Sequence, residues 1–405
     1  MRPLPTAVLL LVAAIILALT LAPSPESIER LPVACFYCSE RATADAIANV
    51  ILFLPLGVAF AWARPGVKAW PWGLAMSLGI ELTQRWIPGR DPSIGDVLTN
   101  ALGMQLGWWL TRYVAVELRR PPRDRAALLA SAGFVAIVAA VVWLFGPAPT
   151  NAQYYGGWTS LLGHLEWYRG RVLTATVNDA ALTVGPLRDD AAVRQFVVGQ
   201  GSIAVKALAG PPVPALAPLV SVFDQREREI VLLGPDRDGL VLRYRRRAAN
   251  LRLDEPDVRL DHALQGVARG DTLTVTAERG ARRACLALGS RAACLPVATP
   301  GRGWSLVNYP EVLSTAFRHA LDVLWVGGLA LLVGWYAGVR RILAAAAAIV
   351  FGALVFVPLL GSIAPAPPSE LGAAALGLAA GALVRRALAH DRLSQLGDAA
   401  IDPVV

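Results

Sequence analysis

The sequence predicts a polytopic α-helical membrane protein of about eight transmembrane helices, with an all-β jelly-roll or sandwich domain inserted in the chain. The first observation is composition: the 405 residues are 55% hydrophobic and 17% charged, whereas soluble proteins carry about 25% charged residues. The second is a mean hydropathy of +0.49, spread over repeated apolar stretches. The third is a central segment in which short β-type runs replace those stretches.

Each apolar stretch has the length of a membrane helix, because about 20 residues cross the hydrocarbon core. In chain order they are residues 4–22, 46–63, 70–87, 94–114, 126–145, 317–338, 342–360 and 370–388. In the last stretch, Gly377 and Gly381 have the spacing of a close helix contact. Arg2 and the small residues near Pro23 leave open that the first stretch is a cleaved signal peptide.

Lys and Arg in the short loops predict the orientation, since cytoplasmic loops carry an excess of both. With both termini in the cytoplasm, the basic loops fall on one side: Arg64 with Lys68, residues 112–125, Arg340 with Arg341, and Arg385 with Arg386. The expected domains are a transmembrane domain 1–125, a helix 126–145, an extracytoplasmic β domain 146–316, C-terminal helices 317–390 and a tail 391–405. These loops explain the net charge of +8, so the lipid bilayer is the expected partner and nucleic acid is not.

All four cysteines fall on the expected outer side, where disulfides persist. Cys285 and Cys294 flank a Gly-Ser turn signal, which indicates a bond across a hairpin. Cys35 and Cys38 form a Cys-x-x-Cys motif, for which a structural disulfide is favoured over a redox pair or half of a zinc site. Calcium ligation is a weaker alternative for three aspartates whose spacing does not fit an established calcium-binding loop: Asp224, Asp236 and Asp238. No metal or other cofactor is expected.

Short β-type runs recur from about residue 166 between Gly, Pro and Asp clusters, a rhythm typical of a sandwich or jelly roll. The block PLVSVFDQREREIVLLGPDRDGLVLRYRRR gives residues 165–300 a resemblance to the laminin-G/concanavalin-A-like jelly roll. That resemblance implies a sugar-binding face. Arg243, Arg245 and Arg247 alternate and are expected on one strand face, which either binds anionic glycan or phosphate or is simply solvated.

Polar side chains gather in the hairpin 80–103 and at the start of the preceding apolar stretch. They form three pairs at helical spacing: Asp45 with Asn49, Glu81 with Gln84, and Asp96 with Asn100. Charged groups inside a bilayer cost about 2.5–3.5 kcal/mol each on insertion scales, so we expect the pairs to converge in the outer part of the membrane. The alternative is a structural network that pins the helices together, with Arg85 or Arg90 neutralising an acid.

The motifs Asp45-x-x-x-Asn49-x-x-x-Phe53-x-Pro55-x-Gly57, Glu81-x-x-Gln84 and Arg90 through Asp96-x-x-x-Asn100-x-x-Gly103 resemble the VanZ-like family of bacterial membrane proteins, over about residues 5–115. The resemblance implies a site in a bacterial inner (plasma) membrane. Its substrate-binding residues would be Asp45, Asn49, Glu81, Gln84, Arg90, Asp96 and Asn100. No reaction follows from it. If the protein is an enzyme, Glu81 or Asp96 would be the general acid or base and Arg90 would bind phosphate.

Two functions follow. The first is recognition of a lipid-linked glycan or cell-envelope precursor by the polar site, while the outer β domain holds sugar. The second is a non-catalytic anchor that displays the β domain to a protein partner of unknown identity. A transporter is a weaker third interpretation, because no inverted repeat is evident in the sequence.

Overall fold

The structure is a computed structural model that describes residues 3–23, 40–90, 92–117, 124–160, 165–308, 313–337 and 340–399. The chain forms two compact units. The first contains helices α1 to α4 together with Leu251–Asp254, and the second contains the remaining elements. Cys35 and Cys38 lie outside the described residues.

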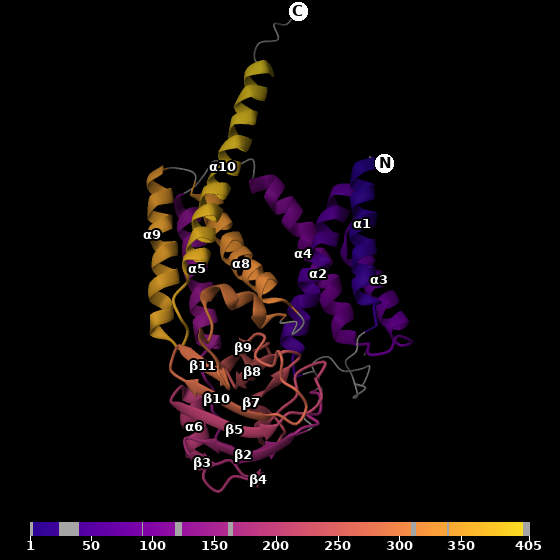
Figure 1. Cartoon of the computed structure of the whole chain (residues 1–405). Coiled ribbons are helices and arrows are strands. Elements are labelled where there is room, and N and C mark those ends of the chain that lie inside the picture. Colours follow the sequence, from indigo (N-terminus) through magenta and orange to yellow (C-terminus); the bar gives the residue numbers. More distant parts are fainter. Residues whose placement is uncertain are drawn as a thin grey trace, which may run out of the picture. The chain divides into compact units, whose positions relative to one another are not determined.

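The first unit is built from α1 (Pro3–Thr20), α2 (Ala42–Ala63), α3 (Trp70–Gln84) and α4 (Ile94–Glu117). Helices α2 and α4 lie side by side along most of their length (Figure 1). They approach closely because Gly57, Gly103 and Gly107 face the backbone of the opposite helix. A Cβ atom on any of the three would come within 2.4 Å of a backbone carbonyl oxygen.

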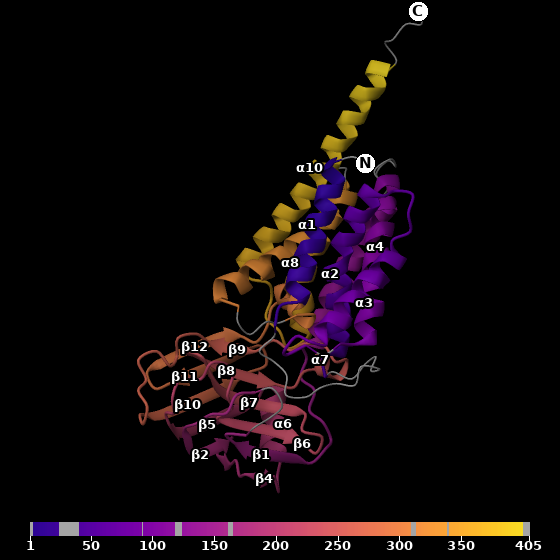
Figure 2. The same cartoon turned by 90° about the vertical axis from the view of Figure 1, so that its right-hand side faces the viewer.

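The second unit contains four further long helices: α5 (Asp124–Leu144), α8 (Thr315–Tyr336), α9 (Arg340–Phe356) and α10 (Pro368–Ala399). Helix α8 packs along α10 (Figure 2). This contact also uses glycines, since a Cβ atom on Gly334, Gly377 or Gly381 would come within 2.2 Å of a carbonyl oxygen of the facing helix.

The protein is a multi-pass membrane protein. Among the described residues, five segments are long and apolar enough to cross a bilayer: Ala42–Ala63, Arg125–Leu144, Thr315–Tyr336, Arg341–Leu360 and Pro368–Leu388. Leu4–Thr20 is a shorter apolar helix. Helices thus lie in all the stretches where the sequence predicts spans, while the number of eight membrane crossings stays a prediction.

The central segment forms a β-sandwich, as predicted. One antiparallel sheet has the order β4-β1-β6-β7-β8-β9, and the other has the order β12-β11-β10-β5-β2-β3. The strands of the first sheet are β1 (Tyr154–Trp158), β4 (Gly185–Pro186), β6 (Val220–Asp224), β7 (Glu229–Asp236), β8 (Gly239–Tyr244) and β9 (Val258–Leu260). Those of the second are β2 (Arg171–Val177), β3 (Ala180–Ala181), β5 (Gly201–Leu208), β10 (Thr272–Arg279), β11 (Arg283–Leu288) and β12 (Arg291–Pro296).

The apolar core of the sandwich lies between the two sheets, and alternating residues of β5 and β10 such as Val205 and Val275 point into it. Short helical segments complete the domain and its connections: α6 (Ala191–Val198), α7 (Arg247–Asn250), η1 (Pro300–Leu306) and η2 (Val357–Leu360). Cys285 and Cys294 are direct partners on β11 and β12 and form the predicted disulfide.

The expected row of three arginines on one strand face is wrong. Strand β8 ends at Tyr244, so only Arg243 belongs to it. Arg245 is 6% exposed and donates to the side chain of Asn250, while Arg247 lies over the ring of Trp143. The strand ends because the chain turns at this point into the isolated bridge between Arg246 and Pro147 and then into α7.

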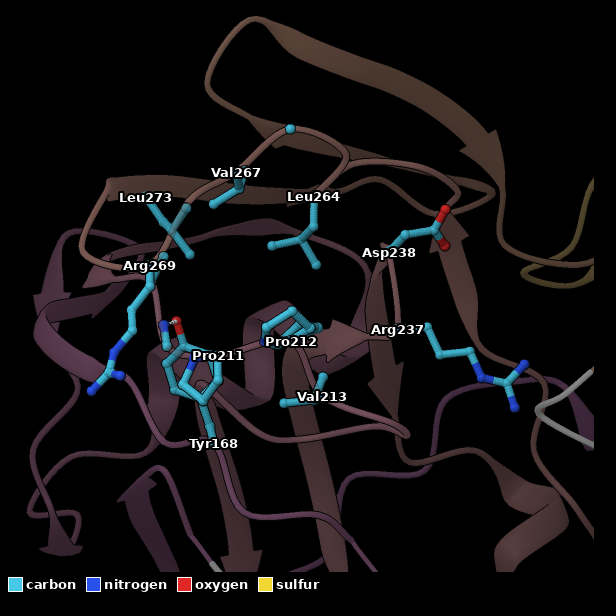
Figure 3. A pocket seen from close by; sticks show the side chains of 14 residues that line it. Tyr168, Pro211, Pro212, Val213, Arg237, Asp238, Leu264, Val267, Arg269 and Leu273 are labelled. Atoms are coloured by element: carbon cyan, nitrogen blue, oxygen red, sulfur yellow. Dashed lines mark hydrogen bonds between the residues drawn. The ribbon is translucent and has the colours of Figure 1, made fainter.

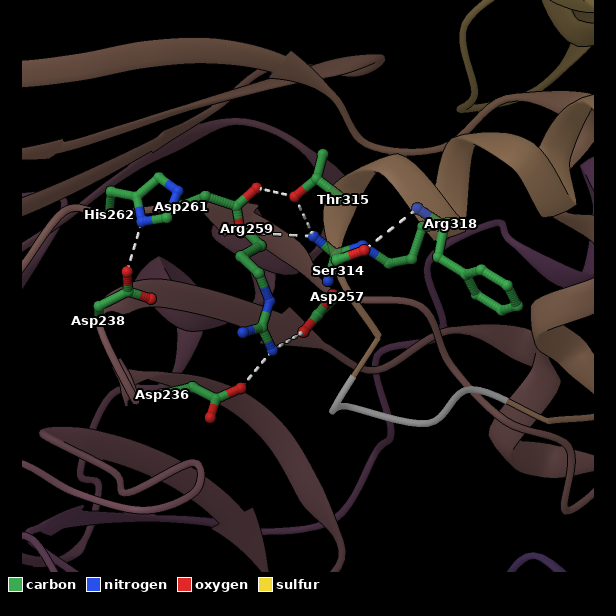
Figure 4. Close-up of polar contacts among 10 residues, drawn as sticks. Asp236, Asp238, Asp257, Arg259, Asp261, His262, Ser314, Thr315 and Arg318 are labelled. Atoms are coloured by element: carbon green, nitrogen blue, oxygen red, sulfur yellow. Dashed lines mark hydrogen bonds and ion pairs between the residues drawn. The ribbon is translucent and has the colours of Figure 1, made fainter.

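The three aspartates considered as calcium ligands are held separately, each by a different basic residue. Asp224 pairs with Arg228, Asp236 with Arg259, and Asp238 with His262. The last two pairs are drawn in Figure 4. The described part of the chain holds no group of three or more His, Cys, Asp or Glu arranged for a metal ion.

A polar cluster ties the β-sandwich to α8 within the second unit (Figure 4). Asp261 accepts a hydrogen bond from the hydroxyl of Thr315 and pairs with Arg318 Nη2 at 3.4 Å. Ser314 caps α8 by accepting from the backbone N–H of Phe317. These contacts fix the first turn of α8 against the strand β9 region.

Candidate functional site

The predicted polar site lies at the amino-terminal ends of α2 and α4 and at the carboxyl-terminal end of α3. Asn49 on α2 donates from Nδ2 to Asp96 Oδ1 on α4 at 2.7 Å. Asp45 and Glu81 both lie close enough to Asp96 to interact with it electrostatically. Side chains from three helices therefore meet, as the spacing of the motifs predicts.

Glu81 joins α3 to the start of α4. Its Oε2 accepts the backbone N–H of Ser93 at 2.7 Å, and its side chain is buried, with 6% of the residue exposed. The hydroxyl of Ser93 in turn accepts from the N–H of Gly95. The carboxylate thus satisfies a backbone donor that precedes the first turn of α4, and Asp96 follows in that turn.

Asn100 and Ser77 form a second contact one turn further along α4 and α3. Asn100 Nδ2 donates to Ser77 Oγ at 2.8 Å, and Asn100 is only 3% exposed. Its Oδ1 atom has no hydrogen-bond partner among the described residues. A buried acceptor without a donor costs about 1–3 kcal/mol, so this atom marks a place where a donor would be favourable.

Gln84 and Arg90 point to α1 rather than to the acids. Gln84 Nε2 donates to the carbonyl oxygen of Thr20 at 2.9 Å. Arg90 donates from Nε to Ala22 O at 2.9 Å and from Nη2 to Leu19 O at 3.0 Å. Both side chains therefore satisfy carbonyls at the end of α1, and a role of either in ligand binding stays a prediction.

The first unit also includes a contact that the sequence did not reveal. Arg41, just before α2, forms an ion pair with Asp254, with Nη2 and Oδ2 2.6 Å apart. The N–H of Ala44 donates to the carbonyl of Arg252 beside it. No local pattern could predict this contact, because the two charged residues are 213 positions apart in the chain.

The site is rich in hydrogen-bond acceptors. Among the described residues, neither Glu81 nor Asp96 forms an ion pair, and their hydrogen bonds come from a backbone amide and a carboxamide. Asp96 and Asn49 are half-buried and Asp45 is exposed, whereas Glu81 and Asn100 are buried. Such a set can bind a donor-bearing group, and its carboxylates have the chemistry of a general acid or base.

A separate cavity lies in the β-sandwich and was not anticipated from the sequence. Its volume is about 440 Å³. Figure 3 shows Leu264 and Val267 facing Pro211 and Pro212 across it, with Arg237 and Arg269 at its two sides. The hydroxyl of Tyr168, which lines the cavity, donates to Leu208 O and accepts from the N–H of Gly210. Burial raises the pKa of Tyr168, so this hydroxyl stays protonated at neutral pH.

Comparison with known proteins supports the family resemblance of the first unit. No curated protein and no solved structure matches the chain. Residues 9–115 match the VanZ/LLP1 family. This segment includes every side chain predicted to form the polar site. The match to the VanZ/LLP1 family therefore covers the polar site of this multi-pass membrane protein and lies within the first unit.

Proposed function

We propose that the polar site of α2, α3 and α4 recognises a lipid-linked glycan or cell-envelope precursor at the outer leaflet of a bacterial plasma membrane. The observation that carries this proposal is the hydrogen bond between Asn49 and Asp96, which joins two helices of a membrane protein at a carboxylate without a cationic partner among the described residues. Ionisable groups at membrane depth are costly, and they are kept where they bind or transfer something.

The outer location rests on the distribution of basic residues. Arg64 and Lys68 follow α2, and Arg112 lies in the carboxyl-terminal half of α4. The positive-inside rule puts those ends in the cytoplasm. The opposite ends, which carry Asp45 and Asp96, are then outside. A headgroup in the outer leaflet would reach them directly.

The β-sandwich is proposed to hold the sugar portion of the same class of ligand. Its cavity supports this role, because the Tyr168 ring and two prolines offer a flat apolar surface and two arginines flank it. Apolar rings and a few polar groups are the usual composition of small-ligand sites. Full-length protein in nanodiscs should bind glycans on an array, and Arg269→Ala should weaken that binding.

The second candidate function is a non-catalytic anchor that displays the β domain to a protein partner. The contact between Arg41 and Asp254 favours it, since an acidic and a basic side chain there join two distant segments of the first unit. In this case the acids of the polar site would only hold α2, α3 and α4 together.

A test separates the two functions with full-length Asp96→Asn and Glu81→Gln in a strain that lacks the protein. We expect both variants to accumulate in the membrane at the wild-type level and to lose the ability to restore envelope function, scored as resistance to antibiotics that act on the cell wall. Glu40→Gln, which changes an exposed acid of the same unit, is the matched control and should restore function fully. Fully active site variants, or variants that fail to accumulate, would favour the anchor.

A further inference from the structure

The contact between α8 and α10 repeats the contact between α2 and α4 residue by residue. A Cβ atom on Gly57 would meet Met104 O, and one on Gly334 would meet Leu378 O. A Cβ atom on Gly103 would likewise meet Val50 O, and one on Gly377 would meet Gly327 O. In the third pair of contacts, a Cβ atom on Gly107 would meet Leu54 O, and one on Gly381 would meet Leu331 O. In all three cases the α8 residue is 277 positions after its α2 counterpart, and the α10 residue is 274 positions after its α4 counterpart.

The same two offsets relate the charged residues of the helices. Asp45 corresponds to Asp322, and Asp96 corresponds to Glu370. Arg41 corresponds to Arg318, and each of these arginines forms an ion pair with an aspartate of the 251–261 segment. Glycine packing alone does not require acids and arginines at matching positions, so the agreement indicates a repeated unit.

The order of the elements agrees with a repeat. We call α1 to α4 the first module, and α5 with α8, α9 and α10 the second module. In each, a long helix comes first and packs on the second, and the second packs along the fourth. Residues 21–41 connect the first two helices of the first module, whereas the β-sandwich is inserted at that position in the second. The repeat is direct in element order.

In the second module, the chain itself supplies a partner for the acid pair. Glu370 accepts the hydroxyl of Thr299 and the N–H of Gly301, the latter at 2.9 Å. Asp322 accepts the indole N–H of Trp304 at 2.8 Å and pairs with Arg302 Nε at 3.2 Å. All four donors come from η1 and the residue before it.

Burial differs accordingly between the two modules. Asp322 is 5% exposed and Glu370 is 1% exposed beneath η1, whereas the corresponding Asp45 is exposed and Asp96 is half-buried. The amides are also confined to the first module, since Val326 and Ala374 stand at the positions of Asn49 and Asn100. In the second module, apolar residues therefore stand where the first has amides, and η1 contacts the acids.

We infer that the first module binds a ligand that presents O–H and N–H donors to its carboxylates, as an amine-bearing sugar does, and not a phosphate. This inference rests on the proposed function of the site and names its ligand class. The donors of η1 show which chemistry this helix arrangement accepts: a hydroxyl, an amide, an indole N–H and a guanidinium. The buried Oδ1 of Asn100 requires a donor as well, and a phosphate would bring only negative charge and acceptors to the acids.

The test measures binding of two probes to the full-length protein in nanodiscs by native mass spectrometry: an alkyl glycoside of 2-amino-2-deoxyglucose, and an alkyl phosphate of equal chain length. We expect the amino glycoside to bind the wild type and to lose about tenfold or more in affinity with Asp96→Asn, the equivalent of one charge-assisted hydrogen bond. The matched variant Glu370→Gln changes the corresponding acid of the second module and should leave the affinity unchanged.

The outcomes are distinct. If the alkyl phosphate binds in a manner that depends on Asp96 and the amino glycoside does not, the inference about ligand class is overturned while the proposed site stands. If neither probe depends on Asp96, both the inference and the proposed function are contradicted. A loss of glycoside binding in Glu370→Gln equal to that in Asp96→Asn would contradict the assignment of binding to the first module.

Discussion

In the first module Asp45 is exposed and Asp96, which accepts from the amide of Asn49, is half-buried, whereas the corresponding Asp322 and Glu370 of the second module are buried under a segment of the chain. Both modules hold their second and fourth helices together by the same glycine contacts. The difference is therefore not in the helical framework but in what occupies the acid pair. It teaches that this pair of helices can carry two carboxylates when hydrogen-bond donors meet them, and that the donors can come from different parts of the molecule.

The largest effect should come from filling the glycine contacts that both modules share. We expect Gly57→Val and Gly334→Val each to destabilise the protein by more than about 3 kcal/mol, because the new Cβ would lie 1.9 Å and 2.1 Å from a carbonyl oxygen. Thermal unfolding of purified protein in detergent measures this loss. Gly79→Ala and Gly328→Ala are controls with nothing within 4 Å of the new atom, and equal losses in the controls would refute the shared contact.

A smaller effect should distinguish the acids of the modules. Glu370→Ala leaves the hydroxyl of Thr299 and the N–H of Gly301 buried without an acceptor, at a cost of about 2–4 kcal/mol. Asp96→Ala should cost about 1 kcal/mol, since Asn49 is half-buried and can be solvated. The same unfolding measurement ranks the two variants, and a larger loss in Asp96→Ala would reverse the assignment of structural and binding roles.

A last effect concerns pH and the β-sandwich, which is inserted between α5 and α8 of the second module. Burial, and to a smaller extent the nearby charge of Glu229, raise the pKa of Glu255 to about 7. The hydrogen bond from the N–H of Arg246 and the charges of Arg245 and Arg246 act in the opposite direction and lower this pKa. Because the folded pKa exceeds the unfolded value, this group contributes full stability below about pH 4.5, and the contribution is lost as pH rises to about 7.

The variant Glu255→Gln should remove that part of the pH dependence. Unfolding temperatures of wild type and variant, recorded from pH 4.5 to 8, give the difference directly. A constant difference across this range would show that Glu255 does not titrate there.

Sequence reasoning located the polar pairs of the first module because each pair lies at helical spacing in an apolar background. Asp45, Asn49, Glu81 and Asp96 do come together, and Asn100 bonds Ser77 one turn further along. The direction of Arg90 depends on where α1 ends, which no local pattern encodes.

The sandwich was predictable from strand rhythm and turn residues, and the disulfide from the hairpin between Cys285 and Cys294. The arginines after β8 were misjudged because alternation continues beyond the strand end, while the chain turns inward. Arg246 is fully buried and Arg279 lies over the ring of Tyr244. Burial lowers the pKa of Arg279 to about 10, which leaves it charged at neutral pH.

The repeat of the helical module could not be recognised from the sequence, because only glycines and a few charged residues occupy corresponding positions. Val326 and Ala374 stand at the positions that correspond to Asn49 and Asn100, so the motif that identifies the first module is absent from the second. The offset also changes from 277 to 274 between helices, which defeats a search at one fixed period. The close contacts between helix backbones are the same in both modules, although most side chains around them differ.

The most direct test of the repeated acid site is disulfide cross-linking in membranes, mapped by mass spectrometry. We predict that Asn49→Cys with Asp96→Cys forms a bond, and that Val326→Cys with Glu370→Cys does so too, because both pairs occupy the same place in their modules. Asn49→Cys with Leu102→Cys, whose second position lies on an exposed face of α4, should not. A bond in the Leu102 pair and none in the other two would contradict the account.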